Sequence, residues 1–107
     1  MLNMLTLVGR LANQPILEEN DGKVCKITLA VPRNYKNEEG VYETDFIDCV
    51  LENNIATNTC EYCKKGDLVG IKGKLKTEYI ENEDNSNKKI MIVAVDSVSF
   101  LAQRKED

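Results

Sequence analysis

The sequence predicts an all-β fold with one helix, and two observations lead to this prediction. Apolar and polar residues alternate in several segments, which is the pattern of a β-strand with one buried face. A single segment, from Asn53 to Lys65, repeats its apolar residues at helical spacing. The chain has 107 residues, of which 42% are hydrophobic. This length and composition suit one domain with its own core.

The first expected strand runs from Met4 to Leu11, and Gly9 within it predicts a bulge or a close approach of another backbone. A turn at Glu18 to Gly22 precedes the second strand, which runs from about Lys23 to Arg33. Pro32 predicts that this strand lies at an edge or ends there, because proline has no N–H for the ladder.

The third expected strand runs from about Val41 to Leu51, after a loop at 37–40. One parity carries apolar residues interrupted by Glu43 and Asp45, and the other carries Tyr42, Thr44, Phe46 and Asp48. Aromatic rings on a face turned away from the core either complete a second packing surface or offer flat rings to a ligand.

The helix is expected from Asn53 to Lys65. Asn53 or Asn54 can cap its N-terminus. Lys64 and Lys65 suit its C-terminal dipole, and Gly66 suits the position after the last turn.

A fourth strand is expected to start near Asp67, followed by a mobile hairpin loop at Glu81 to Lys89 and a last strand at Ile90 to Leu101. Ile90 to Val95 is apolar on both parities, which indicates burial on both faces. One helix between strands three and four of five is the layout of the OB-fold, a five-stranded Greek-key barrel.

Local charge is more informative than the net charge of −4. The segment from Lys64 to Lys76 holds five lysines and one acid, whereas Glu38 to Glu52 holds six acids and no base. Both runs also suit ordinary solvated faces. No apolar run approaches the roughly 18 residues of a membrane span, and the N-terminus lacks the pattern of a signal peptide. We therefore expect a cytoplasmic protein that does not bind membranes.

Taken together, the order and spacing of seven short motifs resemble bacterial single-stranded DNA-binding proteins across nearly the whole chain. The motifs are Leu7–Leu11 (LVGRL), Pro15, Thr28–Val31 (TLAV), Thr44–Val50 (TDFIDCV), Lys64–Gly66 (KKG), Gly73–Thr77 (GKLKT) and Asp96–Leu101 (DSVSFL). The resemblance implies that residues 1–102 form an OB-fold single-strand-binding domain and residues 103–107 a short charged tail.

The resemblance further implies binding of single-stranded DNA without sequence preference, through base stacking and phosphate contacts. Tyr35 and Phe46 fall at stacking positions of the family. Two other positions that are usually aromatic hold Glu52 and Ile80. We therefore expect weaker binding than in a typical member. The residues that we expect to contact phosphate are Arg10, Lys72, Lys74 and Lys76, and Lys36 is a further expected nucleic-acid-binding residue.

The resemblance also implies a homo-oligomer, commonly a tetramer and otherwise a dimer, that is associated with the nucleoid and acts in replication, repair and recombination. Nothing after Phe100 resembles the acidic, aromatic tip with which many members recruit other proteins. An alternative is an OB-fold protein-interaction module, primosome-like or a mobile-element accessory, with little affinity for single strands. Such a module would show little binding at any salt concentration.

An enzyme is a third interpretation, but the sequence offers no organised acid, base or metal site and contains no histidine. Cys60 and Cys63 form a C-x-x-C, yet they lie near the expected end of the helix rather than at its start, where redox pairs are activated. A zinc site would need Cys25 and Cys49 as well. We expect buried cysteines and no cofactor or metal.

Overall fold

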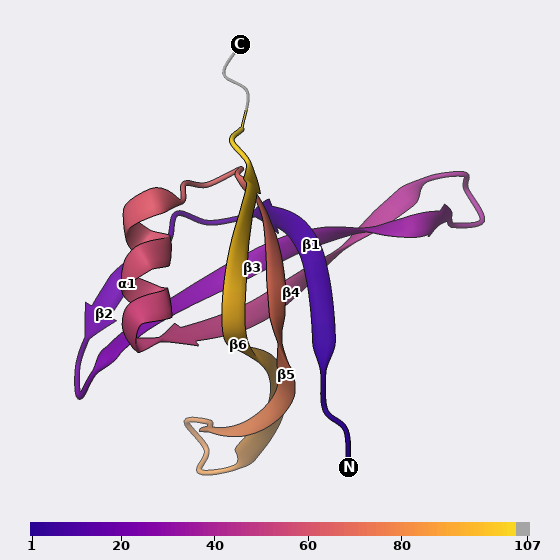
Figure 1. The fold of residues 1–107 in the computed structure, drawn as a ribbon. Coiled ribbons are helices and arrows are strands. Elements are labelled where there is room, and N and C mark those ends of the chain that lie inside the picture. The colour runs from indigo at the N-terminus through magenta and orange to yellow at the C-terminus, as the bar shows by residue number, and fades with distance from the viewer. Residues whose placement is uncertain (105–107) are drawn as a thin grey trace.

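Five strands of the computed structural model close into a barrel, and the structure describes residues 1–104 (Figure 1). The elements in chain order are β1 (Leu5–Leu11), β2 (Leu17–Glu19), β3 (Lys23–Lys36), β4 (Tyr42–Glu52), α1 (Asn53–Tyr62), β5 (Leu68–Glu81) and β6 (Asn87–Ala102). The strands follow the order β1-β5-β6-β4-β3, and β3 returns to pair with β1. The helix lies between the third and fourth barrel strands, which confirms the predicted OB-fold.

Alternating residues of the barrel strands form the core. Cys25, Ile27 and Leu29 of β3 are at most 2% exposed, and Cys49 and Leu51 of β4 are equally buried. On β6, the consecutive residues Ile92 and Val93 point to opposite faces, yet both are buried. The expected burial on both faces is therefore confirmed at Ile92 and Val93, whereas Met91 of the same apolar run is 60% exposed. Met91 lies in the part of β6 that pairs with β5 but not with β4.

The barrel closes where β1 meets β3. The register pairs Arg10 with Ala30 and Leu11 with Leu29. Gly9 lies at this junction, and a Cβ atom there would be 2.5 Å from the carbonyl oxygen of Ala30. The predicted close backbone approach is therefore confirmed.

The helix is shorter than predicted, and its ends differ from the prediction. Glu52 is the N-cap residue, without a side-chain cap hydrogen bond, and Asn53 has a positive φ of 58°. The helix ends at Tyr62 because the carboxylate of the buried Asp67 accepts the backbone N–H of Lys64 at 2.8 Å. That N–H is thereby lost to the helix. No helix within residues 1–104 is long and apolar enough to cross a membrane.

Lys64 and Lys65 consequently lie beyond the helix rather than in its last turn, and Gly66 lies four residues past the helix end. Gly66 has a φ of 94°, and its N–H donates to the carbonyl of Leu11 at 2.8 Å. This glycine therefore joins the turn before β5 to the end of β1.

Three further boundaries differ from the prediction. The short strand β2 was not expected, because three residues are too few to show an alternating pattern. The loop expected at Glu81 to Lys89 shrinks to residues 82–86, since β5 and β6 continue to pair up to Glu81 and Asn87. The strand β3 continues past Pro32 to Lys36, so Pro32 does not end it. Since β1 pairs with β3 only at Leu29 and Ala30, Pro32 lies at an edge of the sheet, as predicted.

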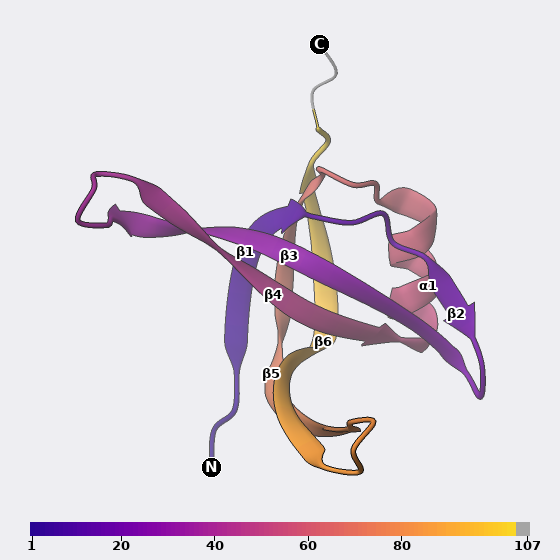
Figure 2. The ribbon, with the colours of Figure 1, turned by 180° about the vertical axis from the view of Figure 1, so that it is seen from behind.

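Two hairpins extend beyond the barrel, and both views show them leaving it in different directions (Figures 1 and 2). One is the distal part of β3 and β4, residues 32–46, which we call the β3–β4 ribbon. The other is the distal part of β5 and β6. In each, two strands have only each other as partners, so their side chains are open to solvent on both faces.

Candidate nucleic-acid interface

Exposed aromatic rings gather on the β3–β4 ribbon. Phe46 is 67% exposed, Tyr35 is 60% exposed and Tyr42 is 55% exposed. Phe46 pairs with Ala30 on the face of β4 that points away from the core. The ring is therefore not a core residue, and its flat surface is open to a ligand.

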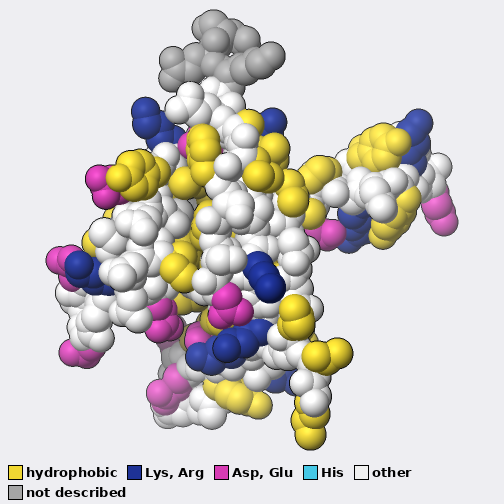
Figure 3. Space-filling view, viewed as in Figure 1, with side chains coloured by type: hydrophobic (Ala, Val, Ile, Leu, Met, Phe, Trp, Pro, Cys, Tyr) yellow, Lys and Arg dark blue, Asp and Glu magenta, His cyan; other side chains and the backbone are white. Residues whose placement is uncertain are grey.

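Tyr42 shares its strand face with Phe46, because the two residues are separated by an even number of positions. Its cross-strand partner is Lys36, whose Nζ lies 5.7 Å from the centroid of the Tyr42 ring. Figure 3 shows basic and apolar side chains beside each other on this projecting arm. Tyr42 belongs to the aromatic set expected on this strand, but it was not among the residues predicted to bind nucleic acid.

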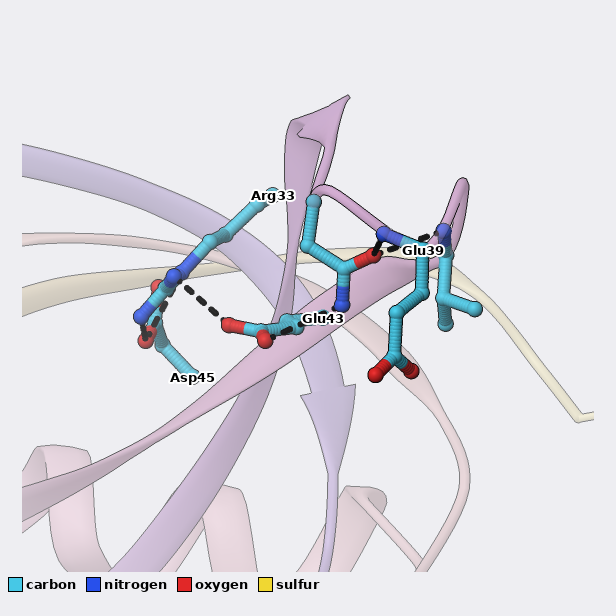
Figure 4. A network of polar contacts seen from close by, with 6 residues as sticks. Arg33, Glu39, Glu43 and Asp45 are labelled. Carbon is cyan, nitrogen blue, oxygen red and sulfur yellow. Dashed lines mark hydrogen bonds and ion pairs between the residues drawn. The ribbon is translucent and has the colours of Figure 1, made fainter.

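The acids of the ribbon lie on the opposite face. Asp45 pairs with Val31, and Arg33 donates from Nε to both carboxylate oxygens of Asp45 at 3.3 and 3.1 Å. Nη1 of Arg33 donates to Glu43 at 2.8 Å (Figure 4). These hydrogen bonds lower the pKa of Asp45 and raise the pKa of Arg33. Arg33 thus offsets part of the negative charge that the two carboxylates give to this face.

The ribbon tip is also ordered by short-range hydrogen bonds. The side chain of Asn37 accepts the backbone N–H groups of Glu39 and Val41 at 2.9 and 3.0 Å, and its amide donates to Glu43 at 3.2 Å. Gly40, with a φ of 78°, completes the turn. The rings are therefore carried by a hairpin whose two strands are tied together at its tip.

Arg10 lies in the same cross-strand row as Phe46. Phe46 pairs with Ala30 on β3, and Ala30 pairs with Arg10 on β1. Two strand spacings place the backbones of Arg10 and Phe46 about 10 Å apart on the outer face. Nη1 of Arg10 donates to the carbonyl of Gly66 at 3.0 Å, which leaves its other donors available.

The three predicted lysines lie on one face of β5, as their spacing predicts. Lys72, Lys74 and Lys76 are all exposed, and Lys76 has a loose ion pair with Glu78 at 3.7 Å. Lys74 pairs with Ala94 of β6, and β6 lies between β5 and β4, so this row is separated from the β3–β4 ribbon along the outer face of the barrel sheet. The fold therefore separates the predicted site residues into a ribbon group and a β5 group.

Between these groups lies an open hollow of about 320 Å³ on the outer face of the sheet. Lys26 and Val50 are cross-strand partners in its lining, and Asp48 and Glu78 also line it. Lys26 was not selected from the sequence, although it alternates with the buried residues of its strand. Because one lysine and two acids line the hollow, its charge is not uniformly positive.

The two positions where the sequence lacks an expected ring are also exposed. Glu52 ends β4 at the start of α1, and Ile80 lies on β5 opposite Lys88. Tyr79 pairs with Lys89 and is 70% exposed. The register of β5 does not shift between Gly73 and Glu81, so Tyr79 and Ile80 point to opposite faces. Tyr79 therefore does not replace a ring at position 80.

The four cysteines are free thiols, and three of them lie in the core. Burial raises the pKa of Cys25 to about 12 and that of Cys49 to about 11, and it also raises the pKa of Cys63. Cys60, on α1, is partly exposed. Protonated, buried thiols are poor nucleophiles and poor metal ligands.

Comparison with known proteins assigns a family to this arrangement. The model of the single-strand binding protein family matches residues 2–101. Single-stranded DNA-binding protein B of Bacillus subtilis is 41% identical over 103 residues, which are 94% of this chain and 91% of that protein. A single-stranded DNA-binding protein of Bacillus cereus is 41% identical over 106 residues, and single-stranded DNA-binding protein A of B. subtilis is 41% identical over 103 residues. The chain spans 62% and 60% of the length of these two relatives.

Proposed function

Because the chain belongs to the single-strand binding protein family, we propose that it binds single-stranded DNA without reading its sequence. Bases stack on exposed aromatic rings, and lysine and arginine side chains contact the phosphates. Stacking tolerates any sequence, since every base has a flat face. The relatives are named single-stranded DNA-binding proteins. The exposed rings of the ribbon support the same activity for this chain.

The observation that carries the proposal is the position of Phe46. A large apolar ring that is 67% exposed on the outer face of a paired strand has no packing role in the monomer. Its row continues through Ala30 to Arg10. A base on Phe46 would therefore have a guanidinium within reach of its phosphate. Tyr35, at the distal end of β3, offers a second ring.

Phosphate contacts are assigned to Arg10, Lys36 and the β5 lysines Lys72, Lys74 and Lys76. Each neutralised phosphate on a single strand changes the slope of log K against log salt by about −0.7. Replacing the three β5 lysines with glutamine should therefore make the slope shallower by about 2, if all three contact the strand. A smaller change in the slope would indicate that the DNA contacts the ribbon side of the barrel and not all three lysines of β5.

The activity is binding rather than catalysis, and we place it in DNA replication, repair and recombination, where single strands are exposed. We assign the binding to residues 1–102, which end with β6. Residues 105–107 of the expected tail lie outside the described part of the chain. In a bacterial cell this activity belongs to the nucleoid, in the cytoplasm.

We also propose that the chain forms a homo-oligomer, either a dimer or a tetramer. Met1, Leu2, Met4 and Val8, in β1 and the residues before it, expose large apolar side chains. Exposed apolar side chains so close together in the sequence favour association. Light scattering at several protein concentrations would measure the oligomeric state.

The test is fluorescence anisotropy of labelled oligo-dT at low and at moderate salt. We compare the wild type with the single variant Phe46→Ala and with the double variant Tyr35→Ala/Phe46→Ala. Each ring should contribute roughly 1–3 kcal/mol of binding free energy. Tyr62→Ala serves as the matched control, because Tyr62 is an exposed tyrosine on α1, away from the ribbon.

The expected result is binding that weakens with salt and that falls further with each ribbon ring removed, while Tyr62→Ala binds like the wild type. Absence of binding by the wild type even at low salt would reject the proposal. The chain would then be an OB-fold module whose partner is a protein.

A further inference from the structure

Tyr42 is not part of the predicted site, although its cross-strand partner Lys36 is. Tyr42 lies at the base of the hairpin turn on β4, and Lys36 is the last residue of β3. Among the exposed rings of residues 1–104, Tyr42 is the one with a lysine ammonium over its face, at 5.7 Å from the ring centroid. Lysine beside an open ring combines a stacking surface with a phosphate donor.

The rings of Tyr42 and Phe46 point the same way along the ribbon. They are four residues apart on one strand, which separates them by about 13 Å. Between them on this face lies Thr44, and its cross-strand partner is Pro32. Both intervening side chains are shorter than the rings, so the ribbon surface between Tyr42 and Phe46 is open to an extended chain.

The charge on the two faces of the ribbon is unequal. Glu43 and Asp45 alternate with the ring residues and so face the other side, where Arg33 binds both. The ring face carries the ammonium of Lys36. A polyanion laid along this face would meet a cation beside the outer ring and would be separated from the carboxylates by the ribbon itself.

We propose that Tyr42, with Lys36 beside it, is an additional base-stacking position, and that the single strand runs along the β3–β4 ribbon from Phe46 to Tyr42. This inference rests on the proposed function, and it adds the path of the single-stranded DNA along the ribbon and a third stacking ring. It also assigns Lys36 to the phosphate next to the base on Tyr42.

The experiment measures oligo-dT binding by anisotropy for Tyr42→Ala, Tyr42→Phe and Lys36→Gln beside the wild type and Phe46→Ala. Tyr42→Ala should weaken binding by about 5-fold to 150-fold. Tyr42→Phe should bind like the wild type, because it keeps the ring. Lys36→Gln should make the slope of log K against log salt shallower by about 0.7.

A second measurement avoids any effect of the substitutions on folding. Photocrosslinking of the wild type to oligonucleotides containing 5-bromouracil, followed by mass spectrometry, should identify peptides attached at Tyr42 as well as at Phe46. Crosslinks at Phe46 without any at Tyr42, together with wild-type affinity of Tyr42→Ala, would overturn this inference and leave the proposed function intact. Absence of binding by the wild type would overturn both.

Discussion

Gly9 offers a sharp test of how the barrel closes. Substitution of Gly9 by alanine would place a Cβ atom 2.5 Å from the carbonyl oxygen of Ala30. Ordinary contacts of this kind begin at 3.4 Å, so the methyl group is about 0.9 Å too close. The same atom would also lie 3.0 Å from side-chain carbons of Leu29 and Val31. Backbone and core atoms on one strand would all have to move.

Such overpacking costs roughly 1–3 kcal/mol. With a urea m-value of about 1.5 kcal/mol/M, a loss of 2 kcal/mol lowers the midpoint of unfolding by about 1.3 M. The assay is urea denaturation at one fixed protein concentration, because self-association would make the midpoint depend on concentration.

Gly70→Ala is the matched control. Gly70 also lies in a barrel strand, but a Cβ atom there would be no closer than 3.7 Å to any neighbour. This substitution should leave stability unchanged or raise it by a few tenths of a kcal/mol, because alanine loses less conformational entropy than glycine. Equal midpoints for Gly9→Ala and Gly70→Ala would refute the close approach of β1 and β3 at Gly9.

Three further predictions concern the ribbon, the thiols and the core. Arg33 holds the pKa of Asp45 below its ordinary value of 3.8, so this carboxylate adds stability above pH 3.8 that is lost as pH falls through its lowered pKa. In pH-dependent unfolding, Asp45→Asn should therefore be less stable than the wild type at neutral pH, and the difference should vanish in acid; a constant difference would contradict the ion pair. The pKa of Cys25 is raised from 9.0 to about 12, mainly by burial, so its stabilising effect is complete below pH 9 and is lost as pH rises toward 12. A thiol reagent at pH 8 should react with the partly exposed Cys60 well before Cys25, and equal rates would argue against a buried Cys25. Leu29→Ala, at a fully buried position, should cost about 2–5 kcal/mol in urea unfolding, and a loss below 1 kcal/mol would mean that the core relaxes around the site.

The alternation of residue types made most of the strands and the core predictable. Cys25, Ile27 and Leu29 are buried as their period-two spacing indicates, and Phe46 is exposed on the opposite parity. These properties follow from strand geometry alone, in which neighbouring side chains point to opposite faces. The short strand β2 escaped prediction because three residues cannot establish a period.

The helix end shows why some boundaries could not be predicted. Local signals favoured a helix that continues through Lys64 and Lys65. In the structure, the carboxylate of Asp67 and the side chain of Gln14 accept the N–H groups of these two lysines. Gln14 is 51 residues away from its partner. A contact over that distance leaves no pattern in the local sequence.

The sequence by itself determined the OB-fold, the family and the identity of the exposed rings at Tyr35 and Phe46, because these depend on local periodicity and on the order of short motifs. Only the tertiary structure decided how the site residues group. It separates the β5 lysines from the ribbon, places Arg10 in one row with Phe46, and sets Lys36 over Tyr42. It also turns Glu43 and Asp45 toward Arg33 and away from Phe46 and Tyr42. The physical reason is that charge and stacking act through space, so their balance is settled only when strands distant in the chain are brought into register.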